Sequence, residues 1–164
     1  MNEPVNKLAR IVDNLSKLPA GMDMAAISFA VGKLVKSAGT SGVEFVTLTS
    51  STVHVRVRNR KKVQNHIGSV HAAAMALLAE TATGIVVGMN VPDDRIPVIK
   101  TLKVDYLKRA KGDMEAIATL TPEDIERIRT TEKGDIVVPV TVTDGEGKEP
   151  IACEMTWAWV PKRR

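Results

Sequence analysis

The sequence predicts an α+β fold in which a curved antiparallel sheet of about six strands wraps one long central helix. The residues from Val70 to Met89 are mostly apolar on every side, so the helix that they form should be buried nearly all round. Segments in which apolar and polar residues alternate precede and follow this helix, and a period of two is typical of half-buried strands. A chain of 164 residues is expected to form one core.

Two helices should come before the sheet, as an N-terminal helical extension over residues 1–41 ahead of a main domain over residues 42–164. Apolar residues recur at helical spacing over residues 6–18, which predicts an amphipathic helix that Pro19 ends. Residues 22–36 show a second helical pattern, and the run Gly39-Thr40-Ser41-Gly42 should break it.

The alternating segments place two strands before the long helix and four after it. The period of two begins at Val43, and valines at 53, 55 and 57 alternate with polar residues. After the helix, Val98, Lys100, Leu102, Val104 and Tyr106 should share one strand face. Thr121-Pro122 should start a short helix. The further strands are expected at 114–120, 136–142 and 151–160, with a hairpin loop at 144–147.

A curved sheet of this kind covers one face and leaves its edge strands open. Open edges pair readily with another chain. We therefore expect a homo-oligomer, either a dimer or a dimer of dimers.

The composition narrows the class of protein. A hydrophobic fraction of 44% and a charged fraction of 26% are ordinary for a globular protein. The one cysteine, Cys153, excludes an intramolecular disulfide and is expected to pack on a strand. The start Met-Asn-Glu-Pro shows no signal peptide, and a helix rich in Ala, Thr and Gly around a central Glu is a poor membrane span. We expect a cytoplasmic protein without a membrane partner.

The net charge of +4 is unevenly distributed. Basic residues cluster at 56–62, at 108–111 and at 162–164. Such clusters favour polyanions, either nucleic acid or a small molecule that carries phosphate. An aromatic content of only 3% offers little surface for base stacking, so nucleic-acid binding is the weakest of the functional hypotheses.

Glu80 is a lone carboxylate in the middle of the apolar helix. Asp and Glu are seldom fully buried unless they are paired or used. The polar segment from Asn65 through Ser69 to His71 precedes the helix, where free backbone N–H groups are available to bind a developing anion. Three structural alternatives remain open here. Glu80 could bond to a strand, His71 could cap the helix, and Asn65 could be a turn residue.

Helix geometry separates the two ends of this candidate site. His71 and Glu80 differ by nine positions, which is about 900° of rotation and about 13 Å along an ideal helix. They therefore lie on opposite faces and cannot share one catalytic centre within a regular helix. A two-fold dimer would bring the helix start of one subunit to Glu80 of the other.

Asn65, His71 six residues later, and the run Leu78-Ala79-Glu80-Thr81-Ala82 resemble the hotdog-fold thioesterases of the phenylacetyl-CoA and hydroxybenzoyl-CoA type. The segment 104–113 is similar to the strand and turn that follow the helix in that family. The resemblance covers roughly residues 42–160 and leaves most of the N-terminal extension outside. It implies a hotdog fold for residues 42–164.

The resemblance also implies hydrolysis of acyl-CoA thioesters, with CoA present only as part of the substrate and no cofactor or metal. Glu80 would be the general base or the nucleophile, Asn65 would orient the water or the thioester, and His71 would shape the helix start. The Ala72 backbone N–H would hold the oxyanion. Substrate contacts are further expected from Ser69, and from Lys108 and Arg109 with the phosphates.

Two departures from the family pattern keep other functions open. The usual Gly-Gly after the His is Ala72-Ala73 here, and the usual Pro of the later turn is Arg109. The chain could therefore be a non-catalytic module of the same fold that binds an acyl ligand or dimerises. The hydratases of this fold usually carry a His-Phe-Pro-like segment, which this sequence lacks.

Overall fold

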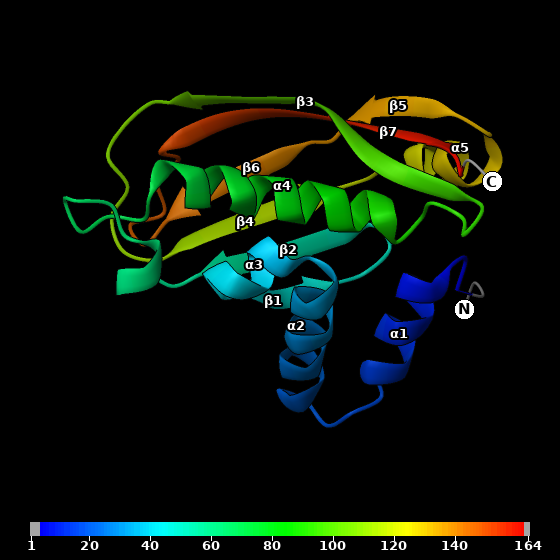
Figure 1. Ribbon diagram of the computed structural model, residues 1–164, viewed down its shortest axis with the longest axis horizontal. Coiled ribbons are helices and arrows are strands. Elements are labelled where there is room, and N and C mark those ends of the chain that lie inside the picture. The colour runs from blue at the N-terminus through cyan, green and yellow to red at the C-terminus, as the bar shows by residue number, and fades with distance from the viewer. Residues whose placement is uncertain (1–3, 163–164) are drawn as a thin grey trace.

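The computed structural model describes residues 4–162 and shows two antiparallel sheets around one long helix, α4 (Ala72–Gly88). Figure 1 shows α4 lying along the strands that curve around it. One sheet has the order β1 (Val43–Leu48), β2 (Thr52–Val57), β4 (Met114–Thr119), β6 (Val140–Asp144). The other has the order β3 (Arg95–Tyr106), β7 (Ile151–Pro161), β5 (Gly134–Val137). The predicted hotdog arrangement is confirmed.

The long helix is held at both ends and along its length. His71 is its N-cap, and the apolar side chains of Leu78, Ala82 and Val86 are fully buried against the sheets. At its C-terminal end, the buried Asn90 donates its side-chain N–H groups to the carbonyls of Val86 and of Ser50 in the turn between β1 and β2. The apolar helix therefore lies at the centre of the core, because both sheets pack against it.

The strand expected at 136–142 is wrong as a single element, because it divides into β5 and β6 in different sheets. Pro139 stands at the division and has no N–H to give to a ladder. Just before it, the Val138 N–H bonds to Met155 of β7. The Pro139 carbonyl accepts from Thr119 of β4. The chain therefore crosses from one sheet to the other here, and residues 4–162 form seven strands instead of about six.

The common face expected for Val98, Lys100, Leu102, Val104 and Tyr106 is also wrong. A bulge at Lys100 shifts the register of β3 against β7 between Ile99 and Thr101. Ile99 then lies opposite Trp157, whose indole N–H bonds to Thr83 of α4, so Ile99 shares the inner face with Leu102 and Tyr106. Val98 and Lys100 do not belong to that face.

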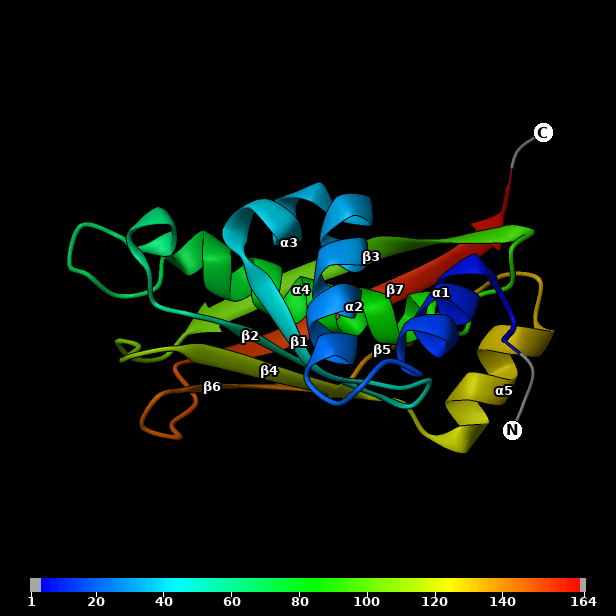
Figure 2. The same cartoon turned by 90° about the horizontal axis from the view of Figure 1, so that it is seen from below.

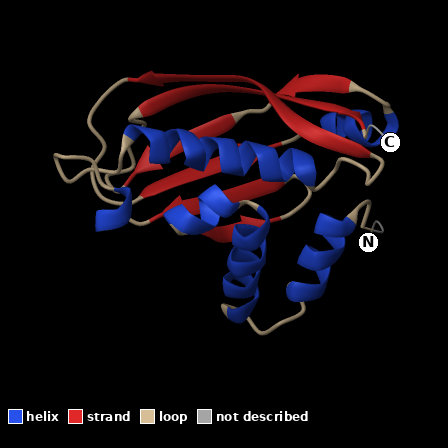
Figure 3. Ribbon diagram, in the orientation of Figure 1, coloured by secondary structure: helices blue, strands red, loops and turns tan. Residues whose placement is uncertain are grey.

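The N-terminal part forms α1 (Lys7–Leu15), α2 (Met22–Leu34) and α3 (Lys36–Ser41), which gather on the β1 side of the molecule (Figures 2 and 3). The predicted break at 39–42 is wrong in position, since the chain turns at Val35 and α3 continues to Ser41. Gly39 does not break a helix. It lets α3 pack on α2, because a Cβ at Gly39 would overlap the carbonyl of Gly32. Gly42, with φ of 72°, ends α3.

The remaining elements are a short 3-10 helix, η1 (Lys61–Val63), and α5 (Pro122–Thr130), which Thr121 caps as the sequence predicts. Within residues 4–162, no helix is long and apolar enough to cross a membrane. Residues 1–3, and Arg163 and Arg164 of the predicted C-terminal basic cluster, lie outside the described residues.

Candidate functional site

The loop before α4 is fixed by Asn65 and Arg109. The Asn65 side-chain oxygen accepts from the N–H groups of Ile67 and Ser69, at 3.1 Å each. From the turn after β3, Arg109 donates to the Ile67 carbonyl at 2.9 Å and to the Ser69 hydroxyl at 3.2 Å. Asn65 is thus a turn residue, while its side-chain amide N–H groups have no acceptor among residues 4–162. The structure brings Asn65, Ser69 and Arg109 together beside the start of α4.

The start of α4 presents one free backbone donor. His71 caps the helix by accepting the Ala73 N–H at Nδ1, with 3.0 Å between the two nitrogens. The N–H groups of Ala74 and Met75 bond to the His71 carbonyl. Only the Ala72 N–H, among these first N–H groups, has no acceptor within the described residues. It lies at the positive end of the helix dipole, where an anion is stabilised.

Tyr106 supports this donor and was not predicted as a site residue. Its hydroxyl donates to the Ala72 carbonyl at 2.8 Å, which ties the first turn of α4 to the end of β3. The only signal in the sequence is that Tyr106, the single tyrosine, falls in the segment similar to the family's strand and turn. The contact itself depends on the register of β3, which the bulge at Lys100 sets.

Glu80 lies two turns further along α4, half-buried, and its carboxylate makes no hydrogen bond or ion pair within residues 4–162. Burial therefore raises the pKa of the Glu80 carboxyl above its ordinary value, since no cation or donor offsets the loss of water. Within the described residues, Glu80 therefore does not have the structural role of a carboxylate bonded to a strand. An unpaired, half-buried acid with a raised pKa is instead typical of a functional site.

Glu80 belongs to a strip of α4 that the chain leaves partly uncovered, together with Ala73, Leu77 and Gly84. Beside this strip lies the inner face of β3. Its Leu102 and Tyr106 are 48% and 50% exposed although they point to the core side of the sheet. Apolar side chains on an inner face are normally covered. Glu80 therefore lies on a surface of α4 and β3 that is only partly covered in the single chain.

The other predicted contacts are dispersed around the start of α4. Lys108 is exposed, and its side chain has no partner within the described residues. A cavity of about 260 Å³ lies beside the helix start and is lined by residues that include Lys62, His71 and Leu77. The structure thus gathers Asn65, Ser69, His71, Ala72 and Arg109 at one end of α4, while Glu80 of the same chain stays apart from them.

Cys153 is not a candidate nucleophile. The thiol is half-buried on β7, and burial together with the charge of Asp105 raises its pKa to about 11. At neutral pH the group is a protonated thiol, which is a weak nucleophile. Within residues 4–162, no group of three or more His, Cys, Asp or Glu residues is arranged to hold a metal ion.

Solved structures share this fold. A structural-genomics protein, APC5556, is 26% identical, with a TM-score of 0.73, and the match covers 94% of this chain and 99% of that one. A Pseudomonas aeruginosa protein described as a probable thioesterase is 23% identical, with a TM-score of 0.74 over 82% of this chain and 93% of its own. A putative thioesterase from Shewanella oneidensis is 13% identical, with a TM-score of 0.71 over 91% of this chain and 99% of its own.

No curated protein sequence matches the chain. These structures confirm the fold that the resemblance around His71 and Glu80 implies. One family model, described as a domain of unknown function, matches residues 23–160, from the start of α2 almost to the end of β7. The chain therefore belongs to this family, DUF4442.

Proposed function

We propose that the protein is a thioester hydrolase that cleaves acyl-CoA as a homodimer, with Glu80 acting opposite the Ala72 N–H of the other subunit. One observation carries the proposal. The half-buried carboxylate of Glu80 has no partner among residues 4–162 and has a raised pKa. The descriptions of several proteins that share the fold as thioesterases support the same reaction class.

The chemistry follows from these two groups. Glu80 takes a proton from water as the water oxygen attacks the thioester carbonyl, and the electron pair of the carbonyl moves to its oxygen. The Ala72 N–H donates to that oxyanion. When the carbonyl re-forms, the C–S bond breaks and the CoA sulfur receives the proton from Glu80. A pKa raised toward neutrality suits a group that must both accept and return a proton.

A nucleophilic role for Glu80 is the second route. Its carboxylate oxygen would attack the carbonyl, expel the thiolate and form an anhydride that water then hydrolyses. A single turnover in oxygen-18 water distinguishes the routes. The nucleophilic route leaves labelled oxygen in the Glu80 side chain when water attacks the Glu80 carbonyl of the anhydride. The general-base route places all of the label in the released acid, so labelled Glu80 demonstrates the nucleophilic route.

The spacing on α4 supports a dimer. Ala72 and Glu80 are eight residues apart, about 12 Å along an α-helix, which exceeds the reach of one tetrahedral centre. The strip of α4 that carries Glu80 and the inner face of β3 are both uncovered in the single chain. A second copy placed there by two-fold symmetry covers both faces and brings its own Ala72 toward Glu80.

The Ala72-Ala73 departure from Gly-Gly is compatible with this role. Ala72 retains its N–H, and the Ala73 N–H is already occupied by His71. A methyl at each position reduces the space for the acyl group without removing a donor. The binding module of the same fold remains the alternative, and it predicts that CoA esters bind without being cleaved.

Thiol release from a panel of short, long and aromatic acyl-CoAs tests the proposal. Wild type should hydrolyse at least one ester, and Glu80→Gln should lose roughly 10²–10⁴-fold in kcat, the usual worth of a positioned base or nucleophile. Glu149→Gln, the same change at an exposed position outside the site, should behave as wild type. Equal rates for Glu80→Gln and wild type would contradict the proposal, and binding without hydrolysis would favour the module.

A further inference from the structure

A groove of about 680 Å³ lies between α2, α3 and β1, away from the residues of the proposed hydrolysis. We call it the α2–α3 groove. Its lining includes Phe29, Lys33, Lys36, Glu44 and Arg60. Ligand sites commonly have this size, with apolar walls and a few polar groups.

The groove carries an excess of positive charge. Lys33, Lys36 and Arg60 line it, and the Lys62 ammonium lies over Gly42 at its end, where a Cβ on Gly42 would be 2.7 Å from the Lys62 nitrogen. Lys36 and Lys62 have no acidic partner within residues 4–162. A cluster of lysines and an arginine attracts phosphate.

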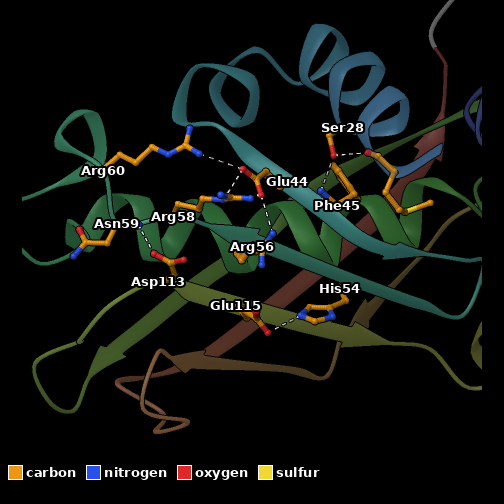
Figure 4. A network of polar contacts seen from close by, with 11 residues as sticks. Ser28, Glu44, Phe45, His54, Arg56, Arg58, Asn59, Arg60, Asp113 and Glu115 are labelled. Atoms are coloured by element: carbon orange, nitrogen blue, oxygen red, sulfur yellow. Dashed lines mark hydrogen bonds and ion pairs between the residues drawn. The ribbon is translucent and has the colours of Figure 1, made fainter. Parts of the chain in front are cut away.

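The one acid of the groove, Glu44, is already used by arginines of β2 and the segment after it. Its carboxylate accepts from Arg56 at 3.0 Å and pairs with Arg58 at 3.0 Å, while Arg60 is 3.8 Å away (Figure 4). Three guanidinium groups around one carboxylate leave a net charge of +2 before the lysines are added. Glu44 therefore orients these arginines and does not neutralise the groove.

Phe29 adds a flat apolar surface beside these charges. Phe29 is 69% exposed, and the Lys33 ammonium lies 5.3 Å from its ring centroid. Phe29 therefore presents an accessible aromatic surface at the rim of the basic groove. Aromatic rings next to cations are suited to stack a nucleobase whose phosphates the cations bind.

The groove continues toward the start of α4. Lys62 lies over its end at Gly42 and also lines the cavity beside His71. Ser41 and Gly42, adjacent in sequence, line the second cavity and the groove respectively. A ligand bound in the groove would thus point its other end toward the Ala72 N–H.

We propose that the α2–α3 groove binds the nucleotide end of the CoA ester, with its phosphates on Lys36, Arg60 and Lys62 and its adenine on Phe29. The inference rests on the proposed function for the acyl end of the ligand. It gives the N-terminal extension a role in substrate recognition. The sequence predicts that Lys108 and Arg109 contact the phosphates, and the groove proposal replaces that prediction. Arg109 already donates two hydrogen bonds to the loop before α4.

Binding of adenosine 3′,5′-bisphosphate to the full chain, measured by calorimetry, tests the groove without any need for hydrolysis. Lys36→Glu and Phe29→Ala should each weaken binding about tenfold or more. The matched control is Lys17→Glu, a lysine of the turn after α1 that lies outside the groove and pairs with Asp13. Unchanged affinity in Lys36→Glu, or a loss in Lys108→Glu instead, would overturn the inference.

Two further binding measurements distinguish the bisphosphate from other ligands that carry phosphate. Inorganic pyrophosphate that binds as tightly as the bisphosphate, with no effect of Phe29→Ala, would show a bare anion site and contradict the proposal. A single-stranded oligonucleotide whose affinity rises with its length would show a nucleic-acid surface and contradict it too. Preference for the bisphosphate, lost in Phe29→Ala, supports the groove.

Failure of the groove and failure of the hydrolase are distinguishable. If wild type cleaves acyl-CoA, the ratio of kcat/KM for acyl-CoA to that for the matching acyl-pantetheine should fall about tenfold in Lys36→Glu, because only the CoA ester carries the nucleotide. An unchanged ratio would overturn the groove and leave the hydrolase intact. Bisphosphate binding that depends on Lys36 and Phe29, without any hydrolysis, would overturn the hydrolase and leave the groove intact.

Discussion

The two sheets end in edge strands that the chain treats in opposite ways. At β1, the Ser28 hydroxyl of α2 accepts the Phe45 N–H at 2.8 Å and donates to the Met24 carbonyl at 2.7 Å, so a helix covers the edge (Figure 4). At β3, the edge opposite β7 pairs with no other strand within residues 4–162. Its Val98 and Leu102 remain exposed.

An uncovered edge strand with apolar side chains invites pairing with another chain, and proteins normally protect such edges. This chain covers the β1 edge with its own N-terminal helices and leaves the β3 edge without a strand partner within residues 4–162. The difference supports the proposal that a second copy covers the β3 edge. The basic groove lies at the β1 edge, and Glu80 lies beside the β3 edge. Our proposals therefore assign the nucleotide end of the substrate to the first edge and the acyl end to the second.

The largest expected effect is at the β3 edge. Leu102→Arg places a guanidinium on the inner face of β3, where a second copy would have to bury it without a partner. We expect the dimer dissociation constant to rise by about 10²-fold or more, which is about 2.7 kcal/mol, and thiol release to fall with it. Sedimentation velocity across a concentration series measures the change.

The matched control is Val137→Arg on β5, where the original side chain is 56% exposed on another edge strand of the same sheet. It should leave the oligomeric state unchanged. A Leu102→Arg protein that remains as dimeric as the control, or a wild type that is monomeric at all concentrations, would refute the dimer through β3.

A smaller effect is expected at the β1 edge. Ser28→Ala leaves the Phe45 N–H without its acceptor under α2, and an unsatisfied backbone donor costs about 1–3 kcal/mol. Urea unfolding followed by circular dichroism measures this loss. Ser37→Ala, an exposed serine of α3, is the control and should change the free energy of unfolding little. Equal stability of the two variants would show that α2 does not protect the edge through Ser28.

The smallest effect concerns the charge beside the β3 edge. Burial raises the pKa of Glu80 in the folded protein, so the folded state holds its proton at pH values where the unfolded chain has lost it. Its contribution is fully present below the ordinary pKa of 4.5 and is lost as the pH rises through the folded-state value. Glu80→Gln, with no charge to bury, should therefore become more stable than wild type as the pH rises toward 8.

Thermal unfolding of both proteins between pH 4 and pH 8 measures that difference. A stability gap that does not change with pH would mean that Glu80 titrates normally. The same raised pKa predicts that the hydrolysis rate rises with pH through a value above the ordinary one, since the ionised carboxylate is the active form.

Much of the fold follows from local patterns in the sequence. The apolar run around Leu78 predicts α4, because a helix buried on all sides is apolar throughout. The valine alternation at 53–57 predicts β2, because burial of one strand face leaves a period of two. The bulge at Lys100 leaves no such trace, since it depends on the pairing of β3 with β7. Gly39 is visible in the sequence but misleading, because a glycine that packs closely on another helix looks the same in a sequence as a glycine that ends a helix.

The candidate site also has a part that the sequence predicts and a part that depends on tertiary contacts. The free Ala72 N–H and the cap by His71 follow from helix geometry, and the separation of Glu80 from them follows from counting residues along α4. The bond from Tyr106 and the clamp by Arg109 depend on strands that meet α4 from far along the chain. The groove on α2 and α3 depends on tertiary packing, so the sequence shows only its separate lysines and Phe29.

Subunit mixing tests the central claim most directly. Ala72→Pro removes only the N–H, because proline is accepted at the first position of a helix and His71 already has an extended backbone, with φ of −64° and ψ of 145°. Alone, Ala72→Pro and Glu80→Gln should each have little activity. Mixed in equal amounts and allowed to exchange subunits, they should recover about a quarter of wild-type activity, since half of the dimers then hold one complete site of two. No recovery, with exchange confirmed by mass, would contradict a site built across two subunits.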